Sequence, residues 1–196
     1  MHRPAWVAAW ALALLLGLAC AMAGGAWAQD AAQVYMREPM RIPMPAAGPK
    51  GLEALLVRPA APGRYPLALI NHGSPRVSAE RAGMTPYAYL PQMMEFARRG
   101  WAVAVVMRRG FGDSGGGFAE NFGTCQDPGY LASARSSAND LRAAIAYLSA
   151  RPDIDATRII SVGQSAGGLA TVALTADPPA GLVAAINFAG GRGSPT

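Results

Sequence analysis

The chain has few histidines, and its last part has no carboxylate side chains. Its 196 residues contain two histidines, His2 and His72, and the segment after Asp177 contains neither a histidine nor a carboxylate side chain. A catalytic acid or base drawn from the last part of the printed chain is therefore excluded. His, Cys, Asp and Glu nowhere cluster with the spacing of metal ligands, so the sequence predicts no metal site.

Cysteine is equally rare, with Cys20 and Cys125 alone in the sequence. Cys20 falls in an N-terminal segment that we expect to be removed, and Cys125 would then be the one cysteine of an exported protein. Export favours disulfide pairing because the compartment is oxidising. A partner cysteine outside these residues and a buried, unpaired thiol are both compatible with the sequence.

Clustered positive charge is also missing. The formal net charge is +5, yet Arg98-Arg99 and Arg108-Arg109 are the only adjacent basic pairs, and Lys50 is the sole lysine. Without a basic stripe, we expect neither nucleic acid nor anionic lipid as a partner. Hydrophobic residues make up 52% of the chain, which excludes global disorder and allows one domain with a substantial core.

The N-terminus has the pattern of a secretory signal peptide. A basic start over 1–3 is followed by an apolar stretch over 7–18 and by Ala26-Trp-Ala28, a small-x-small cleavage site. We expect cleavage after Ala28 and a secreted or periplasmic protein without membrane contact. An uncleaved membrane anchor is an alternative because apolar residues continue to Trp27, and lipidation at Cys20 is another.

After residues 1–28, we expect an N-terminal arm or edge strand over 29–50 and one domain over 51–196. The domain alternates strands at 52–57, 66–71, 101–107, 158–162 and 182–189 with helices at 87–99, 133–151 and 167–176. This alternation predicts an α/β fold with a doubly wound, mainly parallel sheet.

Three segments of this domain carry further expectations. We expect the first two strands to pair with each other through the turn 59–64. We expect the glycine-rich segment 108–130 to be a functional loop. The strand 182–189 has the composition of a buried strand, but the chain ends shortly after it. We therefore expect this apolar strand at an edge of the sheet, where it is an aggregation hazard.

The motif Gly163-Gln-Ser165-Ala-Gly167 carries the strongest chemical signal. It follows the apolar run 158–162 and precedes a run of small residues that starts a helix. A serine at the apex of such a sharp strand-to-helix turn is strained, and Gly163 and Gly167 let the two segments pass each other. Ser165 is therefore a candidate nucleophile. The N–H groups of the new helix, beginning with that of Ala166, are candidate donors to a developing oxyanion.

The other motifs favour structural roles. The segment 110–115 has the spacing of a dinucleotide fingerprint, but no helix pattern follows it, so we expect a turn and no cofactor. His72 ends an early strand, and we interpret it as an orienting or structural imidazole rather than a base. Three carboxylates before the serine motif are candidates for a third triad member, but solvation or local capping explains them: Asp113, Asp127 and Asp140.

Four segments in this order resemble the α/β-hydrolase superfamily: His72-Gly-Ser74, Arg109-Gly-Phe-Gly-Asp-Ser114, Asp140-Leu-Arg-Ala-Ala144 and Gly163-Gln-Ser-Ala-Gly-Gly168. Their order makes the likeness specific. Within the superfamily, the chain is similar to the secreted branch related to dienelactone hydrolases and to acylaminoacyl or dipeptidyl peptidases. The resemblance covers 52–189.

This resemblance implies an α/β-hydrolase fold in which Ser165 attacks an ester or peptide-type acyl bond of a small-molecule or peptide substrate. It implies an oxyanion hole formed by the backbone N–H of Ala166 and that of Gly73 or Ser74. It also implies an acid and a histidine after the nucleophile, which we expect beyond Thr196.

On this interpretation the chain is the N-terminal two thirds of such a domain. It would lack the C-terminal strands, and it would be inactive or weakly active because a serine without its base is a weak nucleophile. The alternative is a non-catalytic exported remnant that acts as a binding or interaction module.

Overall fold

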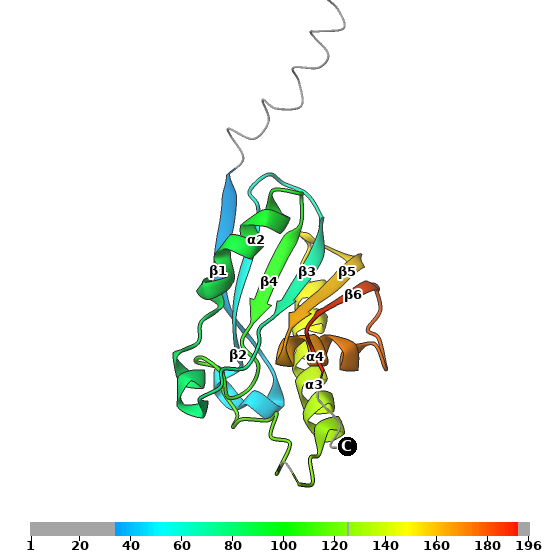
Figure 1. The fold of residues 1–196 in the computed structure, drawn as a ribbon. Helices are drawn as coiled ribbons and strands as arrows, with labels where there is room; N and C mark the ends of the chain where they lie inside the picture. The colour runs from blue at the N-terminus through cyan, green and yellow to red at the C-terminus, as the bar shows by residue number, and fades with distance from the viewer. Residues whose placement is uncertain (1–33, 125, 192–196) are drawn as a thin grey trace, which may run out of the picture. The chain divides into compact units, whose positions relative to one another are not determined.

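Six strands form a single sheet in the computed structural model, which describes residues 34–124 and 126–191 (Figure 1). Their order is β1-β2-β4-β3-β5-β6. The strands are β1 Tyr35–Ile42, β2 Leu52–Pro59, β3 Tyr65–Asn71, β4 Ala102–Val106, β5 Ile154–Gln164 and β6 Leu182–Phe188. The pairs β4–β3, β3–β5 and β5–β6 are parallel, whereas β1–β2 and β2–β4 are antiparallel. This mainly parallel α/β sheet confirms the predicted fold class.

Helices cover both faces of the sheet. The α-helices are α2 Leu90–Ala97, α3 Tyr130–Ser149 and α4 Ala166–Leu174, and short 3-10 helices span Pro45–Lys50, Ser78–Gly83 and Pro86–Tyr89. Met93 and Ala97 of α2 pack against one face of β4, at Val103 and Val105. On the other face, α3 and α4 share a second core cluster with Ala104 (Figure 1). The sheet is therefore doubly wound.

The central strand β4 shows why the apolar runs become strands. All five of its residues, Ala-Val-Ala-Val-Val, are buried. A strand covered on both faces needs apolar side chains at every position, because consecutive side chains point to opposite faces. The amphipathic helix α3 instead buries one stripe that faces the sheet: Ala134, Ala138, Leu141, Ile145 and Leu148.

The expected pairing of the first two strands is wrong. β2 and β3 are consecutive in the sequence, but β4 lies between them and pairs with both. β3 and β4 are parallel, so the chain must cross from the end of one to the start of the other, and α2 lies in that connection. The turn at 59–64 joins strands that are not neighbours.

The last strand lies at the edge of the described sheet, as expected, and it is not buried. Its residues are exposed apart from Leu182, which is partly buried. Val183 is 63% exposed and Phe188 is 58% exposed. An apolar strand therefore faces solvent here. Whether a strand is buried depends on the elements that pack against it, and the composition of the strand does not show these.

The predicted signal peptide, its predicted cleavage site and both cysteines lie outside the described residues. Within 34–124 and 126–191, no helix combines the length and the apolar character needed to cross a membrane.

Candidate active site

Ser165 stands alone between the end of β5 and the start of α4. Its backbone φ of 54° and ψ of −121° lie in a region that residues with a Cβ rarely adopt. The side chain is exposed. The Ser165 N–H donates to the carbonyl oxygen of Phe188 at 2.9 Å, and its carbonyl accepts from Leu169 in the first turn of α4 at 3.0 Å. The strained turn therefore presents its hydroxyl to solvent.

The two glycines of the motif are needed for close approach rather than for positive φ. A Cβ on Gly163 would overlap the carbonyl oxygen of Gly167, and a Cβ on Gly167 would overlap the carbonyl oxygens of Asn71 and His72. β5, α4 and the end of β3 thus meet at backbone contact. This packing sets Ser165 beside the segment that follows β3.

The predicted oxyanion donors lie around the serine. A Cβ on Gly73 would stand 3.5 Å from both the Cβ of Ser165 and the carbonyl oxygen of Gln164. Ala166 is the first residue of α4, so its N–H is one of those without a partner inside the helix. The structure brings Ser165, Ala166 and the Gly73 region together. Their catalytic roles stay predictions.

His72 has no free ring nitrogen. Its Nε2 accepts from the backbone N–H of Arg108 at 3.1 Å, and Nδ1 therefore carries the proton that it shares with the Gly73 carbonyl at 2.7 Å. The residue is fully buried, and burial, together with the positive charge of Arg108, holds the His72 pKa well below 6.5. A neutral imidazole fixed at both nitrogens is a structural group, not a base.

Of the three carboxylates singled out from the sequence, Asp113 and Asp140 pair with basic side chains and Asp127 is exposed, so the expected solvation or local capping is wrong for the buried Asp140. Asp113 is exposed and pairs with Arg41 and Lys50, which lower its pKa through hydrogen bonds. Asp140 is buried against Arg109, and burial raises its pKa. Asp127 is exposed, and its N–H donates to the Thr124 hydroxyl at 3.2 Å. In the described part of the chain, no group of three or more His, Cys, Asp and Glu residues could hold a metal ion.

The glycine-rich segment after β4 is a turn without a helix. Gly110 and Gly112 adopt positive φ values of 80° and 55°. The Ser114 hydroxyl donates to the Met107 carbonyl at 2.6 Å and accepts from the Glu53 N–H at 2.8 Å, which closes the turn against β2. The next helix begins only at Tyr130. In the described residues 108–124 and 126–129 no helix follows the glycines, which confirms the expected turn.

A cavity of about 250 Å³ opens next to the serine turn. Its lining is mostly apolar and comes from β3, β5, β6 and the α2 region: Ile70, Asn71, Tyr89, Gln92, Phe96, Val162, Gly163, Gln164, Ile186 and Phe188. It lies at the carboxyl ends of parallel strands, where ligands bind in open α/β sheets. Ser165 follows directly after the lining residue Gln164.

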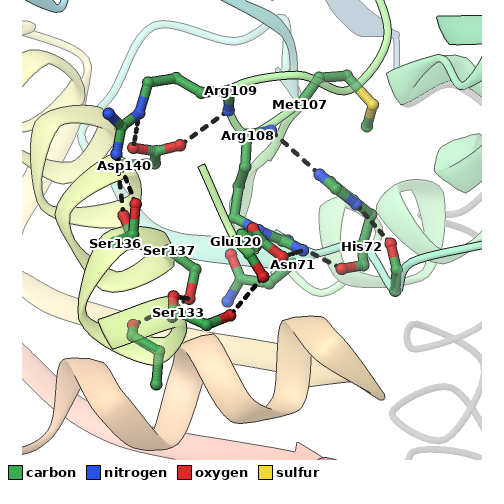
Figure 2. Close-up of polar contacts among 12 residues, drawn as sticks. Asn71, His72, Met107, Arg108, Arg109, Glu120, Ser133, Ser136, Ser137 and Asp140 are labelled. Carbon is green, nitrogen blue, oxygen red and sulfur yellow. Dashed lines mark hydrogen bonds and ion pairs between the residues drawn. The ribbon is translucent and has the colours of Figure 1, made fainter. Parts of the chain in front are cut away.

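Sequence reasoning missed a buried polar network behind His72 (Figure 2). Arg108 directly follows Met107 and is fully buried, and its guanidinium pairs with Glu120 and donates to the His72 carbonyl at 2.8 Å. The sequence held one signal for it. A charged residue directly after an unbroken apolar strand is expected to be buried with a partner, although the partner itself cannot be read from the pattern.

Comparisons with known proteins agree with this geometry. Residues 48–193 match the family model described as X-Pro dipeptidyl-peptidase (S15 family). The fold is similar to a putative dienelactone hydrolase from Klebsiella pneumoniae subsp. pneumoniae, with a TM-score of 0.57 and 17% identity over 83% of this chain and 64% of that one. It is also similar to a dienelactone hydrolase-like promiscuous phosphotriesterase from metagenomic libraries, with a TM-score of 0.56 and 19% identity over 80% of this chain and 60% of that one.

A third similar structure is an aminopeptidase from the marine sediment archaeon Thaumarchaeota archaeon. The TM-score is 0.52 and the identity 19%, over 80% of this chain and 26% of the aminopeptidase. The chain thus spans less than two thirds of each of these three structures. No curated protein matches it. The family match covers most of the chain, so we conclude that it belongs to the X-Pro dipeptidyl-peptidase (S15) family and has the α/β-hydrolase fold.

Proposed function

We propose that this chain carries the nucleophile of a serine hydrolase that acts on ester or peptide-type acyl bonds. The observation that carries the proposal is the exposed Ser165 with a positive φ of 54° between β5 and α4. Strain of this kind persists only where the surrounding structure enforces it, and it is concentrated at functional sites. Membership of a peptidase family supports the same chemistry.

The proposed reaction uses backbone groups to stabilise charge. The Ser165 oxygen attacks the acyl carbon, and the carbonyl oxygen becomes an oxyanion that accepts from the N–H of Ala166 and that of Gly73 or Ser74. The serine proton has to pass to a base. His72 cannot take it because both of its ring nitrogens are occupied, and no histidine follows Ser165 in the printed chain.

Residues 1–196 by themselves should therefore turn over substrate slowly or not at all. The test is hydrolysis of p-nitrophenyl acetate and of Ala-Pro-p-nitroanilide by wild type and Ser165→Ala, with Ser78→Ala as a control at an exposed serine. Fast hydrolysis that Ser165→Ala abolishes would show that a base exists within the chain. Such a result would refute the weak turnover proposed here.

A second assay tests the nucleophile without turnover. A fluorophosphonate should add slowly to Ser165, which intact mass and peptide mapping detect, and Ser165→Ala should not react. Equal labelling of wild type and Ser165→Ala would contradict the assignment of Ser165.

We also propose that the protein is exported and cleaved after Ala28. The pattern that supports this is the basic start, the apolar stretch and the small-x-small site. Expression in a bacterial host, followed by N-terminal sequencing of the exported fraction, should give Gln29 as the first residue. A full-length protein retained in the membrane fraction would favour the uncleaved anchor instead.

One observation favours the non-catalytic alternative, in which the chain is a binding or interaction module. The edge strand β6 exposes Val183, Ile186 and Phe188, and exposed apolar surface of this kind often marks an interaction site. The Ser165→Ala variant distinguishes the two functions. A binding module keeps its function in Ser165→Ala, whereas a hydrolase loses it.

A further inference from the structure

The peptide groups that would hold the oxyanion are themselves held by a buried network that reaches back to the glycine-rich loop. The network consists of Arg108, Glu120 and His72, and we refer to it as the Arg108 clamp (Figure 2). Arg108 follows β4, Glu120 lies in the loop between β4 and α3, and His72 follows β3. The inference below rests on the proposed function, because it concerns how the same site is positioned.

The first link fixes the peptide between His72 and Gly73. Arg108 Nη1 donates to the His72 carbonyl oxygen at 2.8 Å. A trans peptide is planar, so its C=O and the following N–H point in opposite directions. Holding the His72 carbonyl toward Arg108 therefore fixes the direction of the Gly73 N–H, which points away from the guanidinium.

The second link fixes the next peptide. The His72 imidazole shares its Nδ1 proton with the Gly73 carbonyl at 2.7 Å, and this carbonyl belongs to the same planar unit as the Ser74 N–H. The ring is held in turn by the Arg108 backbone N–H on Nε2 and by a T-shaped contact with Phe111, the two ring centroids being 4.6 Å apart. The peptide groups that carry the Gly73 N–H and the Ser74 N–H thus both depend on contacts with Arg108.

Glu120 fixes the guanidinium of Arg108 for the first link, whereas the second link uses the backbone N–H of Arg108. Nε and Nη2 face the two Glu120 carboxylate oxygens, which leaves Nη1 for the His72 carbonyl. Arg108 is fully buried and the Glu120 side chain is 4% exposed. The Glu120 carbonyl accepts from the Ser133 hydroxyl at 2.7 Å, which anchors the loop to α3.

This arrangement supplies geometry more than stability. A buried ion pair often adds no more net stability than an apolar pair of similar volume. A planar guanidinium, however, has several donors at fixed angles, and a lysine cannot direct its ammonium to a carboxylate fork and a backbone carbonyl with the same precision. We propose that Arg108, held by Glu120, is a positioning residue that sets the directions of the Gly73 and Ser74 N–H groups for the oxyanion.

The first test needs no variant. In ¹⁵N-labelled protein, the His72 ring should show the neutral tautomer protonated at Nδ1 across about pH 5 to 8, the range in which a free histidine titrates. Observation of this tautomer supports the second link. A ring protonated at Nε2 has no donor for the Gly73 carbonyl, so that observation would overturn the proposal.

The second test compares two neighbouring arginines. Arg109 also pairs with a buried carboxylate, Asp140, but its hydrogen bonds go to Asp140 and Ser136 and not to His72. In Arg108→Lys, the amide resonances of Gly73 and Ser74 should shift and exchange with solvent about tenfold faster, as expected of a locally loosened segment. The Ala166 amide and the Arg109→Lys variant should show no such change. Equal effects in the two variants, or none in Arg108→Lys, would overturn the clamp.

Glu120→Gln provides the same comparison if Arg108→Lys does not fold. It keeps the side-chain shape and removes the charge that orients the guanidinium. The amide resonances of Gly73 and Ser74 should again shift, and these amides should again exchange faster with solvent, as in Arg108→Lys. Unchanged amides in a folded Glu120→Gln variant would contradict the role given to Glu120.

The third test links the clamp to reactivity. Arg108→Lys should slow fluorophosphonate labelling of Ser165 by about tenfold, less than the loss seen when an oxyanion donor is removed outright, and Arg109→Lys should not. An unchanged rate despite displaced amides would overturn the link between clamp and oxyanion. Wild-type protein that is not labelled contradicts only the proposed function, because the amide and tautomer measurements still decide whether the clamp exists.

Discussion

Gly163 and Gly167 approach each other so closely that a Cβ on Gly163 would overlap the Gly167 carbonyl oxygen and lie 2.6 Å from the Thr171 hydroxyl. The contact joins the last part of β5 to the first turn of α4. Backbone lies on the far side of this contact, so no side chain can rotate away to relieve it. The path of the chain through Ser165 depends on the absence of these two side chains.

Gly163→Ala should therefore destabilise the protein by about 2 kcal/mol, the usual scale for an extra carbon forced into a packed site. Thermal or urea unfolding measures the loss. The control is Gly117→Ala, where a Cβ would meet no atom within 4 Å and φ is not positive. The prediction is wrong if the two variants unfold alike.

Ser165→Gly should have the opposite effect on stability. The φ of 54° and ψ of −121° strain any residue with a Cβ, and glycine relieves that strain at a smaller entropic cost, for a gain of about 1 kcal/mol. Ser165→Ala keeps the Cβ and should unfold like wild type. Equal stability of the Gly and Ala variants in urea titrations would show that the turn is not strained.

Because His72 is buried, we expect the free energy of unfolding to decrease on acidification at pH values well above those at which carboxylates titrate. Its folded pKa lies well below 6.5, so below that pH the unfolded chain binds a proton that the native protein does not. Stability is therefore fully present above about pH 6.5. It falls as the pH drops toward the folded pKa, by up to about 1.4 kcal/mol per pH unit.

The measurement is urea unfolding at several pH values between about 7 and 5. His72→Gln should be less stable overall but should lose the slope in this range, which wild type shows. A slope that survives His72→Gln would assign the sensitivity to another group.

The exposed strand β6 predicts self-association that a charge can suppress. Ile186 lines the cavity beside the serine turn and is 39% exposed on the edge strand. A lysine on an edge strand opposes pairing with other chains, so Ile186→Lys should stay monomeric at higher concentration than wild type. Light scattering after size-exclusion chromatography measures this. The control is Leu131→Lys on α3, at a side chain 63% exposed, and an equal gain there would point to net charge alone.

Local patterns were sufficient to predict the elements and the serine turn. The unbroken apolar run at β4, the helical stripe of α3 and the small residues around Ser165 each encode burial or close approach in neighbouring positions. They cannot encode which strands pair. β2 and β3 were expected to be partners, but periodicity reports only whether a side chain is covered and not which element covers it.

The Arg108 clamp lay beyond prediction for a related reason. Arg108 begins the aperiodic, glycine-rich segment 108–130 and Glu120 lies within it, and only the folded loop brings the two side chains together next to His72. A charged residue in a loop is usually solvated, so the sequence favours the wrong environment for Glu120, and for Arg108 it does not name the partner. His72 was interpreted correctly as structural, but the partner that orients it could not be named.

The place of β4 between β2 and β3 has a consequence for biosynthesis. β1, β2 and β3 leave the ribosome before β4, and β1 can pair with β2, but β2 and β3 do not pair with each other and the gap between them is filled only when residues 102–106 have emerged. Until then the edges of β2 and β3 that pair with β4 are open to chaperones and to other nascent chains. A slow codon stretch that delays the emergence of β4 would prolong that exposure, whereas one translated after β4 has left the ribosome would allow the centre of the sheet to close first.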